Sequence, residues 1–211
     1  MSSEAKTLNQ QNSSSINAYI VINLLMFIML KLGLPINNTI ESVVSKILTS
    51  ATWLLLFGIF TQIINSQFSS QMKAVIVFWR FKEALPGYRA FSDFMHRDPR
   101  IDPSLLKSKL GNLPNKPMEQ NRLWYKLYKK HESKKAVVDA HQKYLLTRDL
   151  ASCSFLCCTV LGIAGYFLLA NTQIWRIYTF ILFMLFLIIS NAARNCGEKL
   201  VSNVLAEESS T

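Results

Sequence analysis

The sequence is poor in glycine, and it lacks the motifs that are typical of several enzyme classes. Only seven of the 211 residues are Gly, and neither phosphate-binding loop pattern, G-x-x-x-x-G-K or G-x-G-x-x-G, occurs. The H-E-x-x-H and G-x-S-x-G motifs of metalloproteases and serine hydrolases are also missing. We therefore predict a non-enzymatic protein that uses no cofactor.

Histidine and cysteine are also few. The three histidines, His96, His131 and His141, have a spacing that fits no recognised metal site. The four cysteines are Cys153, Cys157, Cys158 and Cys196, and they lie within or beside apolar runs. We interpret them as small packing residues, and we expect no metal site and no disulfide.

Charged residues make up only 17% of the chain, whereas hydrophobic residues make up 50%. Soluble domains usually contain about 25% charged residues. The apolar residues gather in four runs: 16–34, 44–64, 150–170 and 174–193. A helix of about 20 residues crosses a hydrocarbon core of about 30 Å. The sequence therefore predicts four membrane-spanning helices.

The connections between these runs predict the fold class. Short links join the first run to the second and the third to the fourth, so we expect two transmembrane helical hairpins. The predicted fold is an all-α membrane protein with a helical cytoplasmic domain inserted between the hairpins. The expected parts are a disordered tail (1–15), hairpin 1 (16–64), a basic helical domain (65–149), hairpin 2 (150–193) and a short cytoplasmic tail (194–211).

The basic residues predict the orientation. If all four runs span, 20 of the 23 Lys and Arg residues lie on the side of the termini and the large loop. Basic loops favour the cytoplasmic side. We therefore expect a multi-pass protein of the bacterial inner membrane with both termini and the loop in the cytoplasm.

The large loop carries clear helix signals. Asp102 followed by Pro103 predicts a helix start, and Gly111 predicts its end. Pro117 can open a second helix, and the apolar spacing changes phase near Glu132. We expect a break there, and a following helix that can continue into the third apolar run. The polar termini, 1–15 and 206–211, are expected to be disordered.

Two features of the loop leave alternatives open. The segment 73–82 contains Trp79 and Phe81 beside Arg80 and Lys82, which suits either a membrane interface or a core helix of the loop. The basic cluster Lys126, Lys129, Lys130, Lys134 and Lys135 is interleaved with Trp124, Tyr125 and Tyr128. We favour a solvated positive face or contact with anionic lipid, and direct nucleic-acid binding is the less favoured alternative.

The third apolar run contains a stripe of small residues, Ser154, Cys158 and Gly162, with Gly165 one turn further on. Such a stripe lets another helix approach closely. It can serve the hairpin itself or a homo-oligomer. Asn23, Gln62 and Asn191 are polar groups in or near the runs, and we interpret them as hydrogen-bonding contacts between helices.

Four loop strings carry a resemblance: LPGYRAFS (85–92), DPRID (98–102), EQNRLWYKLYKKH (119–131) and AHQKYLLTRDL (140–150). They resemble a loop pattern of small multi-spanning bacterial membrane proteins, including membrane effectors of anti-phage, retron-like defence systems. The resemblance implies a protein or nucleoprotein partner that holds the chain inactive, and membrane damage on release. A membrane tether for a cytoplasmic complex is the alternative.

The loop's special residues form a candidate partner surface or an internal set of caps and salt bridges. They are Arg89, Asp98, Arg100, Asp102, Glu119, Asn121, Trp124, His141, Arg148 and Asp149.

Overall fold

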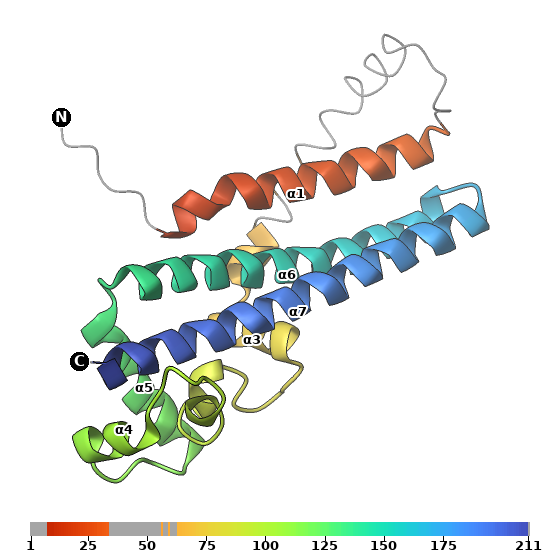
Figure 1. The fold of residues 1–211 in the computed structure, drawn as a ribbon. Helices are drawn as coiled ribbons and strands as arrows, with labels where there is room; N and C mark the ends of the chain where they lie inside the picture. The colour runs from red at the N-terminus through yellow and green to blue at the C-terminus, as the bar shows by residue number, and fades with distance from the viewer. Residues whose placement is uncertain (1–7, 34–55, 57–58, 60–62, 211) are drawn as a thin grey trace, which may run out of the picture. The chain divides into compact units, whose positions relative to one another are not determined.

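The computed structural model describes residues 8–33, 56, 59 and 63–210, with side chains from residue 12 onward (Figure 1). The described residues form helices and no strands. They include six α-helices whose two ends both lie among the described residues, and two short 3-10 helices, η1 and η2. In chain order they are α1 (Leu8–Lys31), α3 (Ser70–Phe78), η1 (Pro86–Arg89), η2 (Phe94–His96), α4 (Pro103–Leu110), α5 (Pro117–His131), α6 (Lys135–Leu168) and α7 (Thr172–Ser210). The predicted all-helical fold is thus confirmed for this part of the chain.

Three helices in the described part, α1, α6 and α7, are long and apolar enough to cross a membrane. They contain the first, third and fourth predicted spans, apart from a few terminal residues. The second predicted span, 44–64, lies almost entirely outside the described residues. Length and composition therefore support a membrane protein with three candidate spans.

The chain divides into two compact units. Unit 1 comprises Met1–Ser69 and Asp149–Ile189, and unit 2 comprises Ser70–Arg148 and Ser190–Thr211. The long helices α6 and α7 each supply residues to both units. α6 also confirms that the helix after the break near Glu132 continues into the third apolar run.

In unit 1, the last two apolar runs form an antiparallel hairpin. Asn171 caps α7, because its Oδ1 accepts hydrogen bonds from the backbone N–H groups of Gln173 and Ile174 at 2.8 and 3.2 Å. One turn into α7, Trp175 Nε1 donates to the Gly162 carbonyl of α6 at 2.8 Å. Asn23 of α1 is buried, and its backbone carbonyl accepts from Tyr178 Oη at 3.4 Å.

In unit 2, the helix signals of the sequence are confirmed. Asp102 Oδ1 accepts from the N–H groups of Ser104 and Leu105 at the start of α4, and Pro103 is its first residue. Gly111 ends α4 with φ +74°, a left-handed value that glycine adopts without steric cost. α5 begins at Pro117, as its sequence predicts.

The helices extend into both termini that we expected to be disordered. α1 begins at Leu8, and α7 continues to Ser210. Near the C-terminus Leu205 and Glu208 are buried. The composition is misleading here because packing partners from distant loop helices stabilise the polar end of α7.

Candidate functional site

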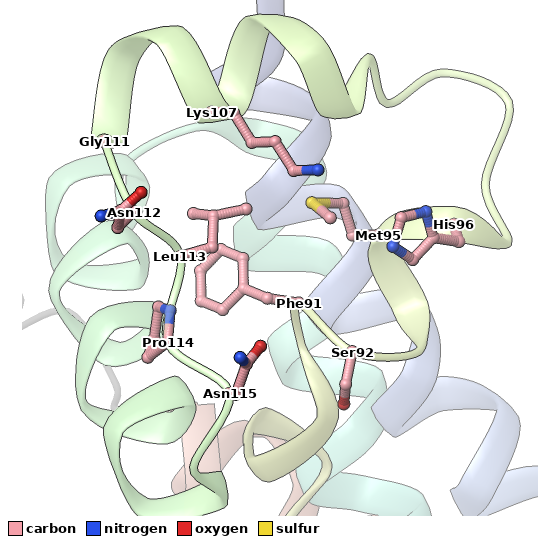
Figure 2. Close-up of a pocket in the computed structure, with 10 residues that line it drawn as sticks. All are labelled: Phe91, Ser92, Met95, His96, Lys107, Gly111, Asn112, Leu113, Pro114 and Asn115. Carbon is pink, nitrogen blue, oxygen red and sulfur yellow. The ribbon is translucent and has the colours of Figure 1, made fainter.

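Unit 2 contains a cleft of about 760 Å³ between α4, the η1–η2 segment and the linker that joins α4 to α5 (Figure 2). Its lining mixes apolar and polar side chains. They belong to Phe91, Ser92, Met95, His96, Lys107, Gly111, Asn112, Leu113, Pro114 and Asn115. A cleft of this size can hold a small molecule or a few side chains of a protein partner.

The two walls of the cleft are joined by Gln120 of α5, which is 1% exposed. Its Oε1 accepts from the backbone N–H groups of Phe91 and Ser92, both at 3.1 Å. The Ser92 hydroxyl donates to the same oxygen at 3.2 Å, and Gln120 Nε2 donates to the Asn115 carbonyl at 3.1 Å. This one side chain therefore fixes the spacing of the walls.

The cleft can bind an anionic group beside an apolar one. Lys107 extends from α4 toward Met95 (Figure 2), and His96 lies on the same wall. The Phe91 side chain lies beside Leu113 in the same view. Ammonium and amide donors next to aromatic and aliphatic carbon suit a carboxylate-bearing side chain or a similar amphipathic ligand.

Three of the predicted surface residues form part of a network inside unit 2. Arg100 donates to Asp98 through Nε and Nη2 at 3.0 and 2.7 Å, and these hydrogen bonds lower the pKa of Asp98. Arg100 Nη2 also donates to Asn203 Oδ1 of α7 at 2.9 Å. Asp102 caps α4, and its backbone N–H donates to Ser209 Oγ at 3.1 Å. Both links connect the loop to α7.

The end of α7 is held by a buried carboxylate. Glu208, 4% exposed, accepts from Lys130 Nζ at 2.9 and 2.8 Å. Its Oε2 lies 2.6 Å from His131 Nε2, and His131 is 3% exposed. Burial alone would raise the pKa of Glu208, but the hydrogen bonds from Lys130 and His131 lower it below the usual carboxylate value. Lys109 Nζ donates to the Glu208 carbonyl at 3.1 Å.

Arg89, Asn121 and Trp124 lie where η1 meets α5. A Cβ atom at Gly87 would overlap Asn121 Oδ1 and would lie 2.8 Å from Trp124 Cε3, so this contact requires glycine. Arg89 lies over the Phe78 and Phe94 rings, 5.7 and 5.3 Å from their centroids. Burial, together with the charge of Arg80, lowers the pKa of Arg89.

The other predicted surface residues are placed separately. Tyr128 Oη lies 3.0 Å from His141 Nδ1, and burial, together with the charge of Arg148, lowers the pKa of His141. Arg148 is buried against the Tyr144 ring in unit 2, and Asp149 is a buried residue of unit 1. Glu119 is exposed, 3.9 Å from Lys116.

The basic cluster of α5 is partly neutralised. Lys129 pairs with Glu132 at 2.7 Å, and Lys130 pairs with Glu208. Lys126, Lys134 and Lys135 are exposed. Trp124 stacks on Tyr128, with ring centroids 5.8 Å apart. Two of the aromatic side chains interleaved with the lysines, Trp124 and Tyr128, therefore pack against each other.

The small-residue stripe of α6 faces two partner helices within unit 1. Ser154 accepts a hydrogen bond from Tyr19 Oη of α1 at 2.8 Å. A Cβ at Gly162 would lie 3.3 Å from Thr179 Cγ2, and one at Gly165 would lie 2.9 Å from Trp175 Cδ1. Cys158 and Gly162 also line an apolar groove of about 440 Å³. The described contacts of the stripe are therefore within the chain.

Sequence reasoning missed Gln120 and Glu208. Gln120 shares a helical face with Leu127 and His131, so its place in the apolar repeat was a usable signal. Glu208 had no such signal, because it lies in a polar segment far from Lys130 in the sequence. Comparison of the chain with family models, with curated proteins and with solved structures gave no match.

Proposed function

We propose that the chain is a non-enzymatic membrane effector that disrupts or permeabilises the membrane when a partner releases or triggers unit 2. The observation that carries the proposal is that α6 and α7 each supply residues to both units. A partner that changes the packing of their polar ends in unit 2 acts on the same two continuous helices whose apolar parts suit a membrane.

The cleft supports a partner of defined chemistry. Lys107 lines it together with the apolar side chains of Phe91 and Leu113, and Gln120 connects its walls. An acidic segment of a cytoplasmic protein or nucleoprotein suits this combination. The setting in bacterial antiviral defence rests on the resemblance of the loop strings.

The number of membrane spans and their orientation are part of the same proposal. With the 44–64 run as a fourth span, the two hairpins flank the 65–149 domain. The basic residues then place the termini and this domain on the cytoplasmic side of the inner membrane. The four-span arrangement predicts that cysteines introduced near Glu4 and at Leu105 react with a membrane-impermeant thiol reagent only after the cells are opened.

The full chain, expressed from a tightly controlled promoter in a bacterium, tests the effector activity. We expect prompt depolarisation together with growth arrest, because an open bundle dissipates ion gradients. Purified protein at high density in dye-loaded liposomes should also release the dye. If cells keep their potential and the liposomes stay sealed, with and without a lysate from phage-infected cells, the proposal is contradicted.

The alternative is a membrane tether for a cytoplasmic complex, and the folded unit 2 with its open cleft favours it. In a tether the spans are inert anchors. Exchanging exposed apolar residues of α7 such as Ile177, Phe180 and Ile188 for other apolar residues should then leave function intact. In an effector the same exchange should alter depolarisation.

A further inference from the structure

Between α3 and η1, five consecutive residues of unit 2, 79–83, are exposed and lie outside any helix. We call them the Trp79–Glu83 loop. Phe81 is 90% exposed and Trp79 is 55% exposed, and the cationic side chains of Arg80 and Lys82 alternate with them. The next residue, Ala84, is fully buried. The loop therefore exposes two aromatic and two basic side chains to solvent, and it is followed directly by a buried residue.

The backbone at both ends of the loop is strained. Trp79 has φ +54° and Glu83 has φ +53°. This left-handed region is sparsely populated by residues other than glycine, and a bulky residue there is an outlier. Such strain persists where surrounding contacts impose it, and it concentrates at binding and switch sites. The strained ends turn the chain outward at the loop instead of continuing α3.

Contacts from α7 hold the first residue of the loop in place. Arg194 Nε donates to the Val77 carbonyl near the end of α3. The Arg194 guanidinium carbon lies 4.1 Å from the centroid of the Trp79 ring, a cation–π distance. The pinned Trp79 fixes the point from which Phe81 projects. The exposure of Phe81 is thus a property of an anchored loop.

The surroundings of the loop are positively charged. The positive charge of Arg80 repels that of Arg89 and disfavours its charged form. The buried Nε and Nη2 atoms of Arg89 have no hydrogen-bond partner among the described residues. Arg97 also lies near Arg89, but Asp93 and Glu198 balance its charge. Within the loop, Glu83 is the one acidic residue beside two cations. An anion at Arg80 and Lys82 would therefore relieve a local excess of positive charge.

We propose that the Trp79–Glu83 loop is a lipid-binding site, in which Phe81 and Trp79 enter the membrane interface while Arg80 and Lys82 bind the phosphates of anionic phospholipids. Aromatic side chains favour the boundary between headgroups and acyl chains. Basic residues beside them add attraction to an anionic surface. The inference rests on the membrane setting of the proposed function and names the lipid class that unit 2 would contact.

The full chain in lipid discs tests the inference. A fluorophore sensitive to polarity is attached at Phe81→Cys, in a chain whose half-buried Cys158 and Cys196 are replaced by Ser. The matched control carries the same fluorophore at Leu105→Cys, an exposed apolar position of α4 in the same unit. The discs contain phosphatidylcholine alone or equal parts of phosphatidylcholine and phosphatidylglycerol, with and without a spin-labelled quenching lipid.

In anionic discs we expect a blue-shifted, lipid-quenched signal at position 81 and a solvent-like signal at position 105. The shift at position 81 should be weaker in phosphatidylcholine alone. Arg80→Gln and Lys82→Gln should each weaken the binding of the loop to anionic lipid about fivefold. Neither substitution should change the unfolding temperature, because both side chains are exposed.

A solvent-like signal at position 81 in anionic discs would overturn the inference, and so would equal quenching in the two kinds of disc. A quenched probe in a protein that leaves liposomes sealed would retain the lipid site and contradict the effector activity. A chain that does not enter discs at all would remove the membrane setting on which both proposals depend.

Discussion

At the scale of single residues, a few buried polar side chains hold unit 2 together. Gln120, Glu208 and Asn203 each connect segments that are distant in the sequence. Removing one partner of a buried hydrogen bond leaves the other unsatisfied, which costs about 1–3 kcal/mol. Such positions are therefore more informative targets than the exposed charges around them.

Glu208→Gln should destabilise unit 2 by about 1–3 kcal/mol at neutral pH, because Lys130 and His131 lose their shared carboxylate. The folded pKa of Glu208 is lowered. Its contribution is therefore present above the ordinary carboxylate pKa and disappears as pH falls through the folded pKa. In detergent, the unfolding temperature of the full-length variant should be lower than that of the parent at pH 7, and the two temperatures should converge in acid.

Glu119→Gln is the matched control, since its pair with Lys116 is exposed and 3.9 Å long and contributes little. A gap between parent and Glu208→Gln that persists unchanged into acid would show that the carboxylate charge is not the cause.

Gln120→Leu should lower stability by about 1–3 kcal/mol, because the Phe91 and Ser92 N–H groups lose their acceptor. Met118→Leu, at an exposed position of the same helix, should stay within about 0.5 kcal/mol. Thermal unfolding provides the measurement, and a Gln120→Leu variant as stable as the Met118→Leu control would contradict the assigned role.

At the scale of elements, the α6–α7 hairpin has glycine at two positions that differ in how much space they leave for a larger side chain. Gly165→Ala places a Cβ 2.9 Å from Trp175, so the ring must move, at a cost of about 1–3 kcal/mol. Gly162→Ala meets Thr179 at 3.3 Å and gains helix propensity of about 1 kcal/mol, so it should be close to neutral. Thermal unfolding in detergent checks this order, and the reverse order would contradict the packing.

At the scale of the whole molecule, the effector and tether proposals give different outcomes for these same variants. Loosening unit 2 with Glu208→Gln should hasten depolarisation of expressing cells if release of that unit activates the helices. Loosening the hairpin of unit 1 with Gly165→Ala should weaken depolarisation. Equal protein levels in the membrane fraction are the control, and unchanged potential for both variants would favour the tether.

The sequence alone predicts the all-helical class, the three described apolar helices and the helix starts at Pro103 and Pro117. These features follow from local signals: the length of apolar runs, caps and prolines. It also indicated the small-residue stripe of α6, without determining which helix would face it.

The contacts of Gln120 and Glu208 and the exposure of the Trp79–Glu83 loop depend on how the chain folds in three dimensions. Glu208 lies in a polar segment expected to be disordered, yet it is buried because Lys130 and His131 meet it from a distant helix. The segment 73–82 left two interpretations open. The structure divides it into a packed helix that ends at Phe78 and an exposed loop that starts at Trp79. Pairings between distant segments leave no periodic signal in the sequence, since they depend on how the helices pack.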